Sequence, residues 1–238
     1  MNKPAYKRVL LKLSGEALAA GSEDILNFEY VSEVCGVIKE CVDLGCEVAV
    51  VVGAGNIWRG RQGGGMNRSR ADHMGMLATT LNSLALQDAR EQHGVDARVL
   101  TAVEMKAFAE TYTYRDAMKH LKKGRVVIFG CGLGMPLFST DTTAAHRAVE
   151  IGADVILMAK NIAGIYSADP KVDPAAVRYD EITYQEILSK GLRVIDTTAA
   201  SFCMEYNMPL FVFGLDKSEN IKKAIMGENI GTIVKVGK

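Results

Sequence analysis

The sequence predicts an α/β protein in which helices cover both faces of a mainly parallel sheet, a three-layer α/β/α sandwich. Apolar, β-rich runs recur along the whole chain, and helical patterns separate them. Several runs lack an alternation of apolar and polar residues, which is typical of strands buried on both faces of a parallel sheet. The links between runs and helices are short, as alternating β and α units require.

Seven segments are expected to be strands, because each is short, apolar and rich in β-branched residues. They are Arg8–Leu13, Glu47–Val52, Ala97–Thr101, Arg125–Phe129, Asp154–Met158, Leu210–Phe213 and Thr232–Val236. Apolar residues repeat at helical spacing from Phe28 to Val42 and from Met74 to Ala89, which predicts helices there.

Glycines and caps mark where these elements end and begin. A glycine after a helical stretch takes the left-handed conformation without a Cβ penalty, and this is expected at Gly45, Gly94, Gly124, Gly152 and Gly191. Thr183 with Glu186 fits a capping box that opens a short helix. Because no low-complexity linker or repeat interrupts the chain, we expect one domain over residues 1–238 with two lobes.

Composition and charge argue against several classes of protein. Lys+Arg is 28 and Asp+Glu is 28, so the formal net charge is zero and nucleic acid is not an expected partner. Lys12 and Glu16 interrupt the N-terminal apolar stretch, and no stretch approaches the length of a membrane span. The 5 cysteines include no C-x-x-C pair, which indicates free thiols in a reducing cytosol and no metal site.

The chemistry is expected at the carboxyl ends of the strands, where open α/β sheets bind ligands. Four strand ends carry unusual loops: Lys12–Glu16, Gly53–Arg59, Gly130–Asp141 and Ala163–Pro170. Glycine-rich loops expose backbone N–H groups that bind phosphate. Two such loops, with a lysine and an arginine at neighbouring strand ends, indicate a site for more than one phosphate.

Two common phosphate-binding motifs are absent from the sequence. No G-x-x-x-x-G-K-[ST] occurs, which excludes a P-loop kinase. To match the dinucleotide-binding fingerprint, Gly53-Ala54-Gly55 would need a further glycine where Trp58 stands, which weakens the interpretation as a dehydrogenase. Asp72, however, follows the loop at about the sequence distance expected of the acid that binds the ribose in that motif.

Several segments together resemble the amino-acid-kinase superfamily. They are Lys12-Leu13-Ser14-Gly15, the glycine loop ending in Arg59, and Gly164–Pro170. Within that superfamily, Gly65-Met66-Asn67-Arg68 followed by Ala71–Thr79 is similar to the bacterial UMP kinase family. The resemblance covers nearly the whole chain, from Tyr6 to Glu228.

This resemblance implies the amino-acid-kinase fold and transfer of the γ-phosphoryl group of ATP to UMP, with Mg²⁺ bound mainly through ATP phosphates and water. It implies a UMP lobe over roughly residues 1–150 and an ATP lobe over roughly residues 151–238. It also implies a cytoplasmic homohexamer, activated by GTP and inhibited by UTP, with Arg98 and Arg125 as effector contacts. The stretch Met66, Met74, Met76 and Leu77 would line a subunit contact or, alternatively, the helix core.

Four residues are expected to be catalytic. Lys12 would neutralise the transferring phosphoryl group, and Arg59 would hold phosphate near the donor–acceptor junction. Asp141 would lie beside the reacting phosphates, and Asp196 would orient Lys12 or a magnesium-bound water. The alternatives are a solvated lysine, a helix-surface arginine, a helix N-cap for Asp141 and a turn acid for Asp196.

The remaining expected contacts come from the same resemblance. Asp72 would accept hydrogen bonds from the UMP ribose, with a helix N-cap as its alternative. The expected ATP contacts are Lys12, Leu13, Ser14, Gly15, Gly55, Arg59, Lys160, Tyr166 and Asp169. The expected UMP contacts are Ala54, Asp72, Leu133, Gly134, Met135, Pro136, Leu137, Phe138, Ser139 and Thr140.

The sequence departs from the family pattern at Ala54, Leu133, Asn161 and Ala163, where glycine, threonine, lysine and aspartate are frequent. Two alternative functions stay open. One is another small-molecule kinase of the same fold, with an acceptor such as aspartate or carbamate. The other is a regulatory protein that binds nucleotides without turnover.

Overall fold

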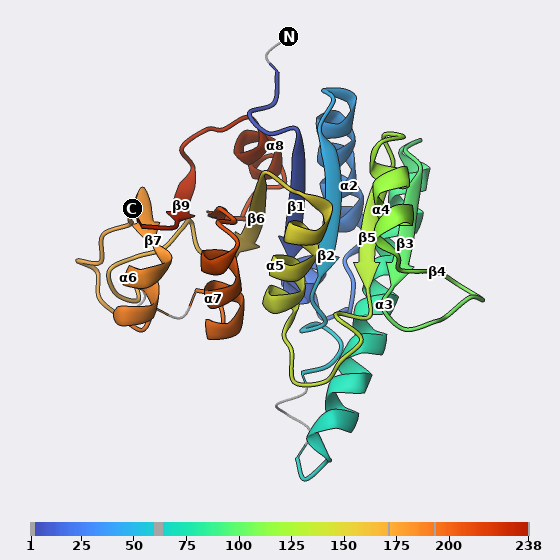
Figure 1. Ribbon diagram of the computed structural model, residues 1–238, viewed down its shortest axis with the longest axis horizontal. Helices are drawn as coiled ribbons and strands as arrows, with labels where there is room; N and C mark the ends of the chain where they lie inside the picture. Colours follow the sequence, from blue (N-terminus) through green and yellow to red (C-terminus); the bar gives the residue numbers. More distant parts are fainter. Residues whose placement is uncertain (1–2, 60–63, 171, 193, 238) are drawn as a thin grey trace.

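The strands predicted from the sequence form one sheet in the computed structural model, which describes residues 3–59, 64–170, 172–192 and 194–237 (Figure 1). The sheet order is β4-β3-β5-β2-β1-β6-β8-β9-β7, and every pairing is parallel except that of β8 with β9. The strands are β1 Arg8–Leu13, β2 Glu47–Val52, β3 Ala97–Thr101, β4 Glu110–Thr111, β5 Val126–Gly130, β6 Val155–Lys160, β7 Glu181–Thr183, β8 Leu210–Gly214 and β9 Gly231–Lys235. The prediction of a mainly parallel sheet is confirmed, and β4 and β7 are additions to it.

Helices connect the strands, and most begin at a side-chain cap. They are α1 Gly15–Ala19, α2 Phe28–Asp43, α3 Arg68–Gln92, α4 Tyr114–Leu121, α5 Thr140–Ile151, α6 Tyr184–Ser189, α7 Thr197–Glu205 and α8 Asn220–Ile225. Every one of α1 to α7 begins at a side-chain cap, whereas α8 has no side-chain cap. The capping box of Thr183 and Glu186 is confirmed at the start of α6. All five glycines predicted in the left-handed conformation have positive φ, from 62° at Gly152 to 92° at Gly45.

Two apolar cores lie on opposite faces of the sheet. One contains buried residues of α2, α3 and α8, and the other contains buried residues of α4, α5, α6 and α7. Side chains alternate between these cores along each strand. Val9, Leu11 and Leu13 of β1 join the first core, and Leu10 joins the second. The helices therefore cover both faces, as the three-layer prediction requires.

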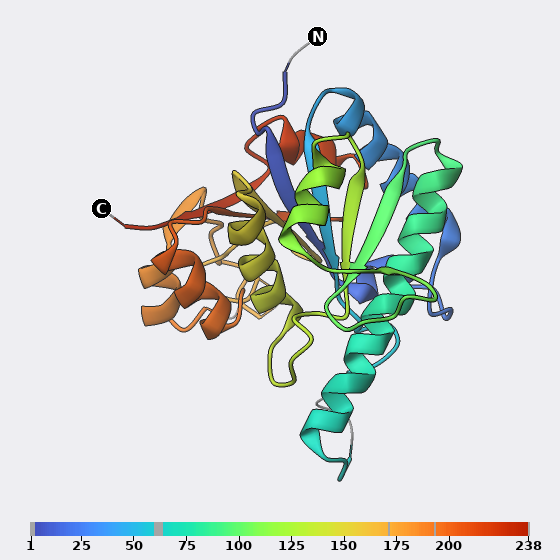
Figure 2. The same ribbon diagram turned by 45° about the vertical axis from the view of Figure 1, so that its right-hand side comes forward.

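Helix α3 begins earlier than its apolar pattern indicates. Its N-cap is Asn67, whose side chain accepts a hydrogen bond from the backbone N–H of Arg70. The N-terminal part of α3 extends beyond the sheet (Figure 2). Because Asp72 lies inside the helix, its interpretation as an N-cap is wrong.

Candidate active site at the carboxyl edge of the sheet

Two lysines of adjacent parallel strands meet one carboxylate at the carboxyl edge of the sheet. Lys12 of β1 lies on the same face as Leu10, and Lys160 of β6 lies on the same face as Met158, so both point toward α5. Asp141, in the first turn of α5, lies between them. Its Oδ1 is 2.8 Å from Nζ of Lys12, and its Oδ2 is 3.5 Å from Nζ of Lys160.

Burial makes this cluster electrostatically strong. Only 7% of the Lys12 side chain and 15% of the Asp141 side chain are exposed, so water screens their attraction weakly. Burial alone would raise the pKa of Asp141, but the ammonium groups of Lys12 and Lys160 outweigh it and lower that pKa below its ordinary value. Asp141 is therefore ionised at neutral pH, and it holds both lysines in place.

Ser139 and Asp196 connect α5 to α7 beside this cluster. Ser139 caps α5 by accepting hydrogen bonds from the backbone N–H groups of Asp141 and Thr142, at 3.0 and 3.1 Å, so the alternative that Asp141 is the cap is wrong. The Ser139 hydroxyl donates to the carboxylate of Asp196. Asp196 is the N-cap of α7, where it accepts from the N–H of Ala199 at 2.9 Å.

The first two glycine loops lie against each other. A Cβ atom on Gly15 would lie 2.7 Å from the carbonyl oxygen of Gly53 and 2.8 Å from the nitrogen of Gly55, so this approach requires glycine. Ser14 caps α1 by accepting from the N–H of Ala17. Leu13 packs its side chain into the core and offers only its backbone, whose carbonyl accepts from the N–H of Gly53 at 2.8 Å.

A fully buried asparagine fixes the second loop, and the sequence interpretation did not include it. Asn82 of α3 donates from Nδ2 to the carbonyl of Gly53 at 2.8 Å, and its side chain exchanges hydrogen bonds with Asn56. Asn82 lies on the buried face of α3 with Ala78 and Leu86, whereas Leu77 and Leu81 of the predicted apolar face are exposed. Arg59, which ends this loop, pairs with Glu16 and has a side chain that is 51% exposed.

A cavity of about 500 Å³, called here the Asp72 cavity, opens between α3 and the loop that follows β5. Trp58, Arg68 and Asp72 line it on one side. The other side includes the expected residues Leu133, Met135, Leu137, Phe138, Ser139 and Thr140, and Ala54 also lines the cavity. Gly134 and Pro136 belong to the same loop and are half-buried.

Asp72 joins α3 to this loop. Its carboxylate accepts from Nε of Arg68, at 3.0 and 3.1 Å to the two oxygens, and from the backbone N–H of Leu137 at 2.9 Å. Leu137 has φ 73° and Cys131 has φ 64°, a left-handed conformation that is unusual for residues other than glycine. Such strained backbone clusters at ligand-binding sites.

Two further cavities continue from the cluster toward the C-terminal half of the chain. The Lys160 cavity, of about 750 Å³, is lined by Asp141, Lys160 and Asp196 together with Leu192 and Val194. Because Asp196 and Thr197 also line the Asp72 cavity, the two cavities meet there.

The third cavity, called here the Tyr166 cavity, has a volume of about 460 Å³. Tyr166 and Asp169 line it, and it shares Leu192 and Val194 with the Lys160 cavity. Asn161 and Ala163, the two departures from the family pattern in this region, are exposed. The three cavities form a groove, and Asp141 and Lys160 of the cluster line its middle part.

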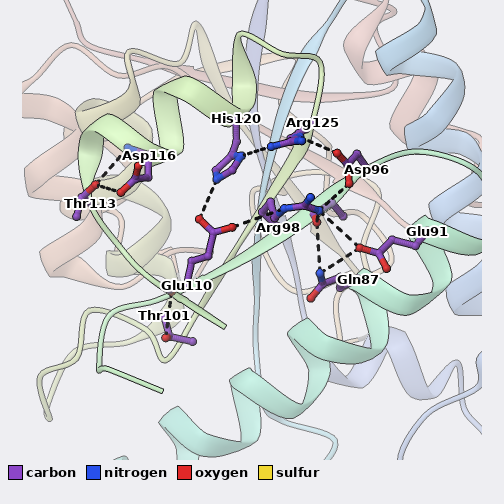
Figure 3. A network of polar contacts seen from close by, with 11 residues as sticks. Gln87, Glu91, Asp96, Arg98, Thr101, Glu110, Thr113, Asp116, His120 and Arg125 are labelled. Atoms are coloured by element: carbon purple, nitrogen blue, oxygen red, sulfur yellow. Dashed lines mark hydrogen bonds and ion pairs between the residues drawn. The ribbon is translucent and has the colours of Figure 1, made fainter. Parts of the chain in front are cut away.

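Arg98 and Arg125 lie away from this groove, in a ring of polar contacts at the β3 edge of the sheet (Figure 3). Asp96 bridges the two arginines, at 2.6 Å from Nη1 of Arg98 and 2.7 Å from Nε of Arg125. His120 closes the ring, with Nε2 2.9 Å from Glu110 and Nδ1 3.1 Å from Arg125. Both arginines are therefore already paired with carboxylates of the chain.

The carboxylates of the groove are engaged by other side chains. Asp141 pairs with two lysines, and Asp196 accepts from Ser139, Thr142 and the backbone of α7. Within the described residues, no group of three or more His, Cys, Asp or Glu side chains is placed to hold a metal ion.

The chain is similar to known kinases over nearly its whole length. Residues 7–214 match the sequence profile of the amino acid kinase family. The UMP kinase from Bacillus anthracis is 36% identical, with 98% of this chain and 97% of that chain covered and a TM-score of 0.94.

Two further solved structures agree with this match. The UMP kinase from Ureaplasma parvum is also 36% identical, with 99% and 100% coverage and a TM-score of 0.92. The uridylate kinase from Archaeoglobus fulgidus is 32% identical, with 95% and 99% coverage and a TM-score of 0.71. The chain therefore belongs to the amino acid kinase family and, within it, to the UMP kinases.

Proposed function

We propose that the chain transfers the γ-phosphoryl group of ATP to the 5′-phosphate of UMP, giving UDP and ADP for pyrimidine nucleotide biosynthesis. The observation that carries this proposal is the placement of the Lys12–Asp141–Lys160 cluster beside the Lys160 cavity, which adjoins the Asp72 cavity at Asp196 and Thr197. Phosphoryl transfer needs positioning and charge stabilisation more than covalent chemistry, and a buried ammonium supplies both. Similarity to UMP kinases identifies the substrates.

The acceptor is assigned to the Asp72 cavity, within the lobe of roughly residues 1–150. Asp72 would accept hydrogen bonds from the ribose hydroxyls, and its contact with the N–H of Leu137 would hold the loop against the nucleotide. Residues from Leu133 to Thr140 would surround the uracil and the phosphate, and Ala54 would approach the phosphate from the second glycine loop.

The donor is assigned to the Lys160 and Tyr166 cavities, within the lobe of roughly residues 151–238. Tyr166 and Asp169 would contact the adenine nucleotide. The backbone of Leu13, Ser14, Gly15 and Gly55 would approach the ATP phosphates, because glycine lets the two loops come close.

Charged side chains of the protein would surround the phosphates at the junction between donor and acceptor. Lys12 would face the γ-phosphoryl group, and Asp141 would hold its ammonium in place. Arg59 would bind phosphate once the nucleotide replaces Glu16 as the partner of its guanidinium group. Asp196, which lines both the Asp72 and the Lys160 cavity, would orient Lys12 or a magnesium-bound water.

Mg²⁺ is proposed to accompany ATP, bound mainly through phosphate oxygens and water. This fits the groove, because Asp141 and Asp196 are engaged by side chains and backbone of the chain. When bound, the ion supplies neutralisation of phosphate charge.

The assembly is proposed to be a homohexamer. On α3, Met74 and Leu77 have exposed fractions of 40% and 55%, and Leu81 has 57%, whereas Met76 is buried. The alternative that the whole stretch is helix core is therefore wrong for Met74 and Leu77, and also for Met66, which is exposed and precedes α3. An exposed apolar helix face of this kind suits a subunit contact.

GTP activation and UTP inhibition are proposed to act at Arg98 and Arg125, where phosphate would compete with Asp96 and Glu110. A cytoplasmic location is proposed because all five cysteines are free and buried. In the part of the chain that the structure describes, no helix has the length and apolar character needed to cross a membrane.

The test is ADP release from ATP with UMP, CMP, dUMP, aspartate and carbamate in parallel. We expect the highest kcat/KM with UMP. Faster release with aspartate or carbamate would identify another kinase of the same fold. Nucleotide binding without release in a single-turnover experiment would identify a regulatory protein.

A further inference from the structure

Asn82 is an asparagine inside α3 whose side chain is fully buried. Asparagine is a weaker helix former than leucine or alanine, and burying an amide costs free energy unless its polar groups are hydrogen-bonded. Ala78 and Leu86, one turn before and one turn after it, are apolar residues of the kind that packing alone would select. The reason for an amide at this position therefore lies in its hydrogen bonds.

Asn82 and Asn56 form a reciprocal pair in which every amide hydrogen is used. Nδ2 of Asn82 donates to the carbonyl of Gly53 and to Oδ1 of Asn56, both at 2.8 Å. Nδ2 of Asn56 donates to Oδ1 of Asn82 at 3.1 Å and to the carbonyl of Ile25 at 2.7 Å. Each side chain must supply both donors and an acceptor, which neither leucine nor an ionised aspartate of the same size can do.

The hydrogen bond to Gly53 sets the direction of the peptide unit that joins Gly53 to Ala54. In a planar trans peptide the C=O and the following N–H point in opposite directions. Because the carbonyl of Gly53 points to Asn82, the N–H of Ala54 points away from Asn82. Ala54 lines the Asp72 cavity, and among the residues that the structure describes none accepts a hydrogen bond from its N–H. This N–H is therefore free to donate to a ligand.

The asparagine pair also contacts the first glycine loop. Oδ1 of Asn56 is the atom nearest to a Cβ built on Gly15, so the amide lies directly against the backbone there. Asn82 therefore fixes the second glycine loop relative to the first loop and to α3, the helix that carries Asp72.

We propose that Asn82 is a positioning residue for the acceptor phosphate: by holding the carbonyl of Gly53, it directs the N–H of Ala54 at the phosphate of UMP. This inference rests on the proposed function. A hydrogen bond from N–H to a phosphate oxygen is strengthened by the charge of the phosphate and depends on the direction of the donor. Because the donor belongs to the backbone, substitution of the Ala54 side chain does not remove it, whereas substitution of Asn82 changes its direction.

The experiment compares binding of UMP with binding of uridine, which lacks the phosphate. Fluorescence of Trp58, the single tryptophan of the chain, reports both, because Trp58 lines the Asp72 cavity. The ratio of the Kd for uridine to the Kd for UMP measures what the phosphate contributes. Asn82→Leu keeps the size of the side chain and removes its donors without adding charge. It is expected to lower this ratio by about 10- to 150-fold, as loss of a hydrogen bond to a charged group does. The Kd for uridine is expected to stay close to the wild-type value.

The matched control is Ser83→Ala, at the next residue of α3. Ser83 is also fully buried, but its hydroxyl donates to the carbonyl of Thr79 within the helix. Ser83→Ala is therefore expected to keep the wild-type ratio. Asn82→Ala is a second neutral variant, in which a smaller side chain replaces the amide, and circular dichroism melting checks that the proteins compared are folded.

Two results would overturn the positioning role of Asn82. One is a wild-type ratio of the two Kd values in the folded Asn82 variants. The other is an equal loss of affinity for UMP and for uridine, which would make Asn82 a structural residue of the cavity wall. A wild type that binds UMP no more tightly than uridine would instead overturn the proposed function, and this inference with it.

Discussion

Lys12 and Asp141 form an ion pair of 2.8 Å although they are far apart in the sequence. The pair joins the carboxyl end of β1 to the first turn of α5. Both side chains are largely buried, so the carboxylate sets where the ammonium points. This relationship underlies the first two predictions.

Replacing Lys12 should abolish turnover and leave the fold intact. Lys12→Met removes a charge directed at the transferring group, and we expect kcat to fall by about 10²–10³, or roughly 3–4 kcal/mol. Binding of UMP should change less, because Lys12 serves the donor phosphate. The exposed Lys39→Met is the control. Near-wild-type turnover in folded Lys12→Met would remove Lys12 from the mechanism.

The ionised form of Asp141 should stabilise the protein in a pH-dependent way. The folded-state pKa lies below the ordinary value of about 3.9, so this contribution is present above about pH 4 and is lost as the pH falls through the folded-state pKa. Asp141→Asn should therefore lose less stability on acidification than wild type. Urea unfolding from pH 7 to about pH 3 measures this difference.

The exposed Asp180→Asn is the control for that experiment, since its side chain is 72% exposed. It should follow the wild-type pH dependence. If Asp141→Asn also followed it, the ion pair with Lys12 would not contribute to acid sensitivity.

Asp72 should determine the preference for ribose over deoxyribose. Hydrogen bonds to a charged group contribute about 1.5–3 kcal/mol, so dUMP should be poorer than UMP by roughly 10- to 150-fold in kcat/KM. Asp72→Ala should lower kcat/KM for UMP more than kcat/KM for dUMP, and so reduce the ratio between the two values. Asp72→Asn tests the need for charge, and Asp88→Ala, elsewhere on α3, is the control.

Because Asn67 caps α3, loss of Asp72 should not reduce stability as loss of a cap would. If the ratio of kcat/KM for UMP to kcat/KM for dUMP were unchanged in Asp72→Ala, Asp72 would have only a structural role, through its contacts with Arg68 and Leu137.

The exposed apolar face of α3 should be needed for assembly. Leu77→Glu combined with Leu81→Glu places charges on this face and should lower the mass measured by light scattering. Val177→Glu is the control, because Val177 is 68% exposed and lies outside α3. A wild type that is only monomeric at micromolar concentration would contradict the assembly proposal.

The sequence predicted the central strands because both of their faces are buried. β4 was missed because both of its residues, Glu110 and Thr111, are exposed. β7 was missed because it is short and Ile182 is its only buried residue. The start of α3 was missed because its first turns are largely polar and extend beyond the sheet.

The candidate site was predicted in its residue types more than in its contacts. Strand alternation places Lys12 on the face of the sheet that carries the second core. Its pairing with Asp141, however, depends on where α5 lies relative to β1. Ser139 and Asp141 are both good N-cap residues, and local sequence does not decide between them. Asn82 was missed because its role depends on a loop that is distant in the sequence.

The most direct test follows the γ-phosphoryl group itself. ATP carrying a radiolabelled γ-phosphate is incubated with UMP and Mg²⁺, and the products are separated for the wild type and for Lys12→Met. We predict that the wild type places the label on UDP and that Lys12→Met does so at least about 100-fold more slowly. Label that remains on ATP, or that appears only as inorganic phosphate, would contradict the assignment of this chain as a UMP kinase.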